Sequence, residues 1–141
     1  MAEVERLSAA PVRALDPAIA WTWQQTLEHC AQSIEYSLQG FPQAKSALFQ
    51  TAVGGPAFQV FAWRGRMSHD LAEPIPGAPA LDASAPDTSG ALARLRAAVQ
   101  AFTAHGGALQ PHFAYGALDK RQYELAHAMH LANHLSAFDL A

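Results

Sequence analysis

The chain has a single cysteine, Cys30, among 141 residues, so an internal disulfide is excluded. It also lacks any cluster of lysine and arginine, and its formal net charge is −3. Because binding to phosphate groups requires a basic surface, we do not expect nucleic acid as the main partner. No apolar run approaches the roughly 18 residues that a membrane span needs. The N-terminus has early acidic residues and no apolar signal-peptide core, so a cytoplasmic protein without a membrane partner is expected.

What the chain does have is enough apolar material for a core. Half of its residues are hydrophobic, and a chain of this length is typical of one domain. We therefore expect a single domain over residues 1–141. Alanine and leucine are frequent, which favours helices over strands.

Hydrophobic periodicity and helix-end signals predict five helical stretches. Gly40 and Pro42 end the second, Asp87 or Thr88 begins the fourth, and Asp119 with Gln122 forms a capping box for the fifth. The predicted helices are residues 3–15 (interrupted at Pro11), 20–39, 42–53 (broken at Gly54–Pro56, with a helical or extended continuation), 88–105 and 119–138. The proline-rich residues 68–86 are expected to form a long loop over the body. The predicted fold is all-α, a four-helix bundle with a short N-terminal helix and this loop.

The second predicted helix has three different faces. The face expected to join the core contains Trp23, Leu27, Cys30, Ile34 and Leu38. The face expected to meet solvent contains Gln24, Glu28, Gln32, Glu35 and Gln39. The third face is uncharged but polar, and it contains Thr22, Thr26, His29, Ser33 and Tyr36. Such a face either lines a polar cavity or packs on a neighbouring helix with its hydroxyl groups bonded to backbone carbonyls.

Three histidines, His127, His130 and His134, share one face of the last predicted helix. His130 and His134 are four residues apart, so both rings can reach one metal ion. A buried imidazole is neutral, and a neutral imidazole is a good metal ligand. However, an HxxxH pair also arises by chance, and the glutamate of the HExxH motif is absent. Structural or surface histidines and a metal site both remain open on this pattern alone.

Other side chains carry weaker signals. His112 precedes the last helix, where it either closes over the site or, as we favour, lies at the surface. His69 and His105 stand in polar, loop-like contexts and are expected to face solvent. Tyr36 and Tyr123 lie on the histidine faces, as hydrogen-bond donors to a bound ligand or as packing aromatics. Cys30 is expected in the core, and Trp21 and Trp23 in the core or at an interface. Arg64 and Arg66 are expected either to face solvent or to bind an anionic substrate.

Two segments resemble a known superfamily. "WTWQQTLEHCAQSIEYSLQGFP" (residues 21–42) is similar to the first histidine-bearing helix of the DinB/YfiT-like superfamily, and "PHFAYGALDKRQYELAHAMHLANHLSAF" (111–138) is similar to its last helix. The resemblance implies a four-helix bundle that binds a divalent metal through three histidines. These correspond to His29, His130 and His134. Five further residues are expected to contact these ligands or to line a pocket beside them: His127, His112, Tyr36, Tyr123 and Ser33.

The functional hypothesis is a divalent-metal-dependent enzyme acting on a small molecule. Three imidazoles leave open positions on the ion, where the pKa of a bound water or thiol falls. The superfamily includes members that use low-molecular-weight thiols, which implies thiol transfer or isomerisation first and hydrolysis second. Zinc or nickel is expected most, and iron or copper also suits three nitrogens. The alternatives are a non-catalytic metal or small-ligand binding protein and a helical protein with a vestigial site. The low charge of the last helix further suggests a homodimer.

Overall fold

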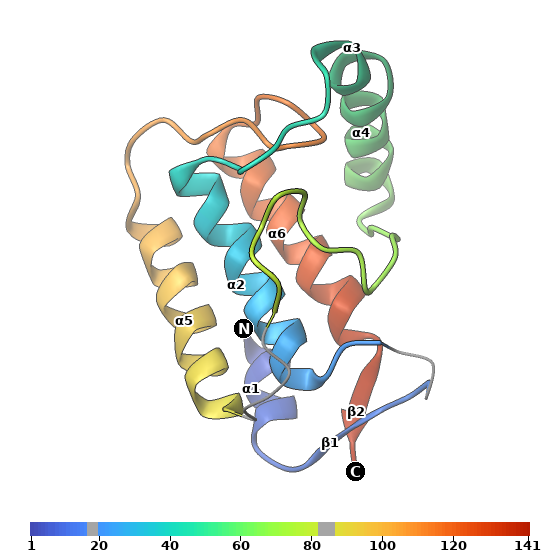
Figure 1. Cartoon of the computed structure of the whole chain (residues 1–141), viewed down its shortest axis with the longest axis vertical. Coiled ribbons are helices and arrows are strands. Elements are labelled where there is room, and N and C mark those ends of the chain that lie inside the picture. The colour runs from blue at the N-terminus through green and yellow to red at the C-terminus, as the bar shows by residue number, and fades with distance from the viewer. Residues whose placement is uncertain (17–19, 82–86) are drawn as a thin grey trace.

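The computed structural model describes residues 1–16, 20–81 and 87–141, and within them the chain is mostly helical with a small two-stranded sheet (Figure 1). The prediction of a helical protein is confirmed, whereas the sheet was not predicted. The elements in chain order are α1 (Ala2–Ser8), β1 (Val12–Ala14), α2 (Trp23–Gln39), α3 (Ala47–Phe49), the π-helix η1 (Gln50–Gly54), α4 (Gly55–Arg64), α5 (Thr88–Ala104), α6 (Lys120–Leu135) and β2 (Phe138–Leu140).

The central helix is α2, which packs against both α5 and α6 (Figure 1). For this reason the face of α2 predicted to meet solvent is largely covered, and that prediction is wrong for Gln24 and Gln32, which are buried. The amide oxygen of Gln24 accepts a hydrogen bond from the backbone N–H of Asp87 just before α5. Nearer the C-terminal end of α2, on the same face, Glu35 forms a two-point ion pair with Arg94 of α5 at 2.7 and 2.9 Å.

The ends of the two site-bearing helices follow the sequence signals. Thr22 and Gln25 form a capping box at the start of α2, and Asp119 and Gln122 form the predicted one at the start of α6. Gly40 ends α2 with φ of 104°, a conformation that suits glycine. These caps fix the length of each helix and therefore the positions of the histidines on them.

The third predicted helix is placed differently by the structure. It begins at Ala47 after the cap Ser46, not at Pro42, and it is not broken at residues 54–56. The chain instead passes through the π-helical turn η1 directly into α4, where Pro56 lies in the first turn. A proline lacks the N–H and crowds the preceding turn of a helix, and a wider π turn accommodates this without ending the helix.

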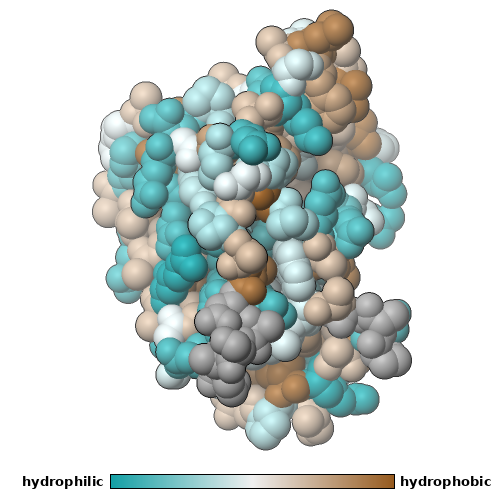
Figure 2. All heavy atoms as spheres, in the orientation of Figure 1, coloured by the Kyte–Doolittle hydropathy of each residue, from teal (hydrophilic) through white to brown (hydrophobic). Residues whose placement is uncertain are grey.

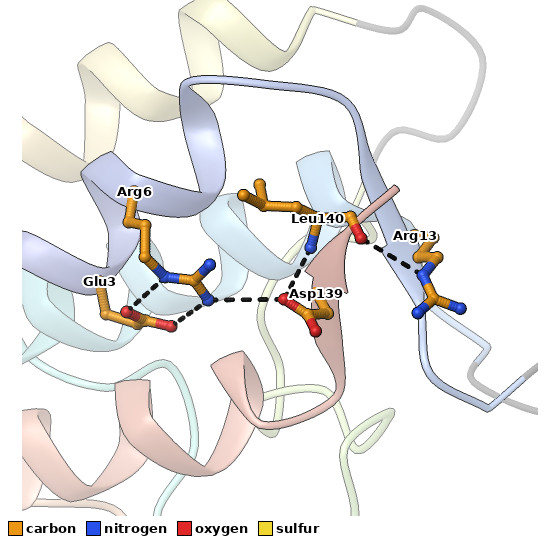
Figure 3. A network of polar contacts seen from close by, with 5 residues as sticks. All are labelled: Glu3, Arg6, Arg13, Asp139 and Leu140. Atoms are coloured by element: carbon orange, nitrogen blue, oxygen red, sulfur yellow. Dashed lines mark hydrogen bonds and ion pairs between the residues drawn. The ribbon is translucent and has the colours of Figure 1, made fainter.

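The two ends of the chain meet in the antiparallel pair β1–β2, in which Val12 lies opposite Leu140 and Ala14 opposite Phe138. The first and last predicted helices were therefore too long, because their outer residues form this sheet. Polar contacts support it (Figure 3): Arg6 bonds Glu3 at 2.7 Å and reaches Asp139 at 3.6 Å. Arg13 donates to the carbonyl of Leu140.

The main core lies between α1, α2, α5 and α6, and a smaller one lies between α4 and α6. Cys30 is buried in the main core, as predicted, and burial raises the pKa of its thiol to about 12. The smaller core contains Phe58, Met67, Ala126 and Met129. No helix of the described chain is long and apolar enough to cross a membrane.

The homodimer stays a prediction, and the surface suggests a test for it. The most exposed large hydrophobic side chains lie on the α3–η1–α4 segment rather than on α6, with Trp63 86% and Leu48 78% exposed. Figure 2 shows hydrophobic residues around α3, at the top of the view, and along the side of α4. A dimer that covers it should lose affinity when Trp63 is replaced by Glu, since burial of a charge is unfavourable. Light scattering across micromolar concentrations measures this, and a monomeric wild-type protein would contradict the prediction.

Candidate metal centre

The structure brings His29 of α2 together with His130 and His134 of α6, although His29 and His130 are 101 positions apart in the sequence. Side-chain nitrogens of the three residues all lie within 4.8 Å of one another, and the group could hold a metal ion. The ring centroids are 4.7 to 4.9 Å apart. His29 and His134 are buried, while His130 is partly exposed.

The nitrogen atoms are oriented as ligands would be. Nε2 of His29 and Nε2 of His130 face each other at 3.0 Å, close to the roughly 3.3 Å between two nitrogens on a tetrahedral zinc ion with bonds near 2.05 Å. Nε2 of His134 is buried and has no hydrogen-bond partner among the described residues. A buried polar atom without a partner is unfavourable, and a metal ion would satisfy it.

Electrostatics keep these rings neutral. Burial lowers the pKa of His29 to about 4 and that of His134 to about 3, and neighbouring imidazoles add to both effects. The pKa of His130 is lowered well below its usual value, chiefly by burial and then by His134 and His29. At neutral pH all three therefore carry lone pairs available to a cation. None of these three candidate ligands is a carboxylate, so a divalent ion held by them alone would retain its full charge.

The Nδ1 atoms of His130 and His29 differ in their hydrogen bonding. Nδ1 of His130 lies 3.2 Å from the hydroxyl of Ser33, the kind of contact that orients a metal-binding imidazole. Ser33, expected near the site, is thus beside a candidate ligand. Nδ1 of His29 is buried without a partner among the described residues. The indole of Trp21 covers the cluster instead, with its centroid 4.7 Å from His29 and stacked on His134 at 6.1 Å.

His127 lies outside the group of His29, His130 and His134. Its Nε2 lies 3.2 Å from the hydroxyl of Ser37, and its ring packs against Phe102 and Tyr123. Tyr123 is fully buried and donates its hydroxyl proton to the carbonyl of Gln110 at 2.6 Å, so it is a packing aromatic. Tyr36, half-buried, packs on Phe41 at 5.8 Å. Neither tyrosine lines the cavity beside the histidines.

A cavity of about 300 Å³ adjoins the cluster and reaches the surface. His29, Ser33 and His130 form its inner wall, and His127 also contributes. The remaining lining comes from the loops around α3, after α4 and before α6, and from α6: Lys45, Phe49, Met67, His69, Glu73, Pro74, Ile75, His112, Phe113, Ala114, Tyr115 and Ala126. The cavity is therefore polar at the histidines, apolar along its sides, and charged at Lys45 and Glu73, which are both exposed.

His112 is buried and lines this cavity, so the prediction of a surface position is wrong. Its Nδ1 accepts hydrogen bonds from the backbone N–H groups of Ala114 and Tyr115 at 3.1 and 3.2 Å. The ring proton must then reside on Nε2, for which the described residues offer no partner. Burial, with a smaller contribution from His127, lowers the pKa of His112 to about 3. His112 is therefore a neutral donor with a fixed tautomer.

The loop that carries His112 is held by the α3–η1 segment. Lys45 donates its backbone N–H to the carbonyl of Phe113 at 2.8 Å, and the side chain of Gln50 also reaches that carbonyl. Gly54 of η1 passes so close that an added Cβ would overlap the Ala114 carbonyl. Gly116, with φ of 79°, closes the turn by pairing with His112. The glycines at 54 and 116 thus permit the close approach that shapes the cavity.

His69 was expected to face solvent, and that prediction is wrong. Its ring is half-buried against the cluster, with its centroid 5.1 Å from both His130 and His134. Sequence periodicity has no signal for it, because it belongs to no helix.

Trp21 was assigned to the core or an interface, whereas its indole lies over the histidine cluster. The one sequence signal for this position was its spacing of eight residues from His29, about two helical turns. His105 lies at the end of α5 and contacts the Ala108 carbonyl.

Comparison with protein-family models finds one match, described as a protein of unknown function, DUF1569, over residues 1–140. The chain belongs to the DUF1569 family. No curated protein and no solved structure was found to match it. The DUF1569 match includes the three-histidine cluster, the cavity and both histidine-bearing loops.

The buried histidines predict a pH-dependent stability. The folded-state pKa values of His112 and His127, about 3 and 4, lie below the unfolded value of 6.5. Below pH 6.5 the unfolded chain therefore binds more protons, and the free energy of unfolding should fall as pH decreases toward 4. Urea denaturation of the chelator-treated protein at several pH values measures the slope, which should be shallower for His112→Gln. A free energy of unfolding that is constant between pH 7 and 5 would contradict this.

Proposed function

We propose that this DUF1569 protein is a divalent-metal-dependent enzyme in which His29, His130 and His134 hold the ion. The observation that carries the proposal is the convergence of three neutral imidazoles, one with a buried and unpartnered Nε2, beside a cavity large enough for a small molecule. We further propose that α2, α4, α5 and α6 form a four-helix bundle of the DinB/YfiT-like type. The resemblance of residues 21–42 and 111–138 supports this relationship.

The chemistry proposed is activation of a low-molecular-weight thiol, in thiol transfer or thiol-dependent isomerisation. A divalent ion with three imidazole ligands, zinc or nickel by preference, acts as a Lewis acid that favours the deprotonated form of a thiol or water nucleophile. Ser33 holds the ring of His130 in orientation. His112 offers its Nε2–H to a carbonyl or carboxylate oxygen of the substrate, and Lys45 adds positive charge at the cavity mouth.

Two other functions use the same residues. One is hydrolysis with an activated water, and the other is non-catalytic binding of a metal or small ligand. The apolar side walls of the cavity, formed by Phe49, Met67, Ile75 and Phe113, favour a substrate with a hydrophobic part over a bare ion. A purely metal-binding role would not need these walls, so we place the enzyme first.

The metal content of the untagged protein, purified without chelators, tests the ligand set. We expect about one divalent ion per chain, because three imidazoles in one place bind it tightly. His29→Ala and His134→Ala should weaken metal affinity by more than about 100-fold, since loss of a ligand costs more than loss of an outer-shell partner. His105→Ala is the matched control and should retain full stoichiometry. Full occupancy and affinity in His29→Ala would refute the proposed site.

A titration of the cobalt(II) form distinguishes thiol from water chemistry. If a thiol is the nucleophile, 2-mercaptoethanol should produce a sulfur-to-cobalt charge-transfer band at a pH well below the free pKa of the thiol, because the ion favours the deprotonated form. His29→Ala should lack the band. Hydrolytic chemistry instead predicts no band and an activity with esters that rises near neutral pH. Absence of both the band and ester turnover in cobalt-loaded protein would leave metal binding as the function.

A further inference from the structure

The imidazole of His69 is a fourth ring beside the three-histidine cluster. Its centroid lies 5.1 Å from those of His130 and His134, whereas the three cluster rings are 4.7 to 4.9 Å apart. Its nitrogens are not part of the set that lies within 4.8 Å. His69 is therefore adjacent to the cluster, on the side of the cavity, without belonging to its closest group.

The hydrogen bond of His69 uses Nδ1 and leaves Nε2 available to a metal. Its Nδ1 lies 2.8 Å from the backbone carbonyl of Asp70. A carbonyl oxygen only accepts, so Nδ1 carries the proton and the lone pair of the neutral ring is on Nε2. Metal-binding histidines commonly donate their other ring N–H to a backbone carbonyl in this way. Nε2 of His69 has no hydrogen-bond partner among the described residues.

The backbone at His69 is attached to the ligand-bearing helix but is not locked in a helix or strand. The amide of Asn133, next to His134 on α6, donates to the His69 carbonyl at 3.4 Å. His69 follows α4 in an irregular segment, and its neighbours Ser68 and Asp70 are exposed. This hydrogen bond connects His69 to α6, while no helix or strand fixes its backbone.

We propose that His69 is a fourth, exchangeable metal ligand. Three ligands come from the helices α2 and α6 and are fixed, while the fourth comes from the loop and occupies the open position when no substrate is bound. A substrate thiol entering from the cavity would take this position as the thiolate, and its proton would pass to the Nε2 lone pair that His69 frees as it withdraws. The inference rests on the proposed function, because it requires a metal at His29, His130 and His134.

The test compares the absorption spectra of cobalt(II)-loaded wild type, His69→Ala and the control His105→Ala. Cobalt ligand-field bands report the number and kind of ligands without any need for turnover. His69→Ala should still bind one cobalt per chain, with affinity only about tenfold weaker, because a ligand that exchanges with substrate contributes less than the fixed ligands His29 and His134. Its bands should change because water replaces an imidazole. Added imidazole should restore the wild-type spectrum in His69→Ala. On adding 2-mercaptoethanol, the spectra of wild type and His69→Ala should become the same.

The outcomes separate this inference from the function on which it rests. A wild-type spectrum and affinity in His69→Ala would overturn the fourth ligand and leave the three-histidine site intact. Altered bands that imidazole does not restore would show a structural effect and would also overturn it. Spectra that stay different in saturating thiol would overturn the exchange. If the wild type binds no cobalt, the proposed function fails, and the fourth ligand fails with it.

Discussion

The contact between α2 and α6 at His29 and His130 is the interaction on which the site depends. Two neutral imidazole nitrogens face each other at 3.0 Å inside the protein, and without a metal one of them must donate to the other. Nearby, Nε2 of His134 has no partner among the described residues. Burial of several imidazoles lowers their pKa values and removes stability at acidic pH, so this arrangement is costly unless a cation uses the lone pairs.

Around this contact, helices form one side of the cavity and loops form the other. The helices α2 and α6 are fixed by capping boxes at their starts and by the core between them, so their histidines have defined positions. The opposite side of the cavity is made of loops that carry His69 and His112. The π turn and Gly54 bring the α3–η1 segment close enough to hold the His112 loop. The loop side of the cavity therefore depends on loop packing rather than on helix periodicity.

Much of the site could be predicted because it lies on helices. His130 and His134 share a face by their spacing alone, and the polar face of α2 singles out His29 and Ser33. The resemblance then joined the two helices. The structure places these residues together, where they could hold a metal ion, and metal binding, the identity of the metal and the reaction are proposals. By contrast, His69 and His112 were expected at the surface, because a loop residue carries no periodic signal and its burial depends on what packs over it.

The sequence by itself determined the helical character, the end of α2, the start of α6 and the faces of their histidines, because capping and helical periodicity are local. Only the tertiary structure decided that Gln24 and Gln32 of α2 are buried, that residues 138–140 pair with residues 12–14 as a sheet, and that the chain passes from the π turn η1 directly into α4, where Pro56 lies in the first turn. It also decided that four histidine rings meet. Each of these outcomes depends on contacts between segments distant in the chain, which no local pattern records.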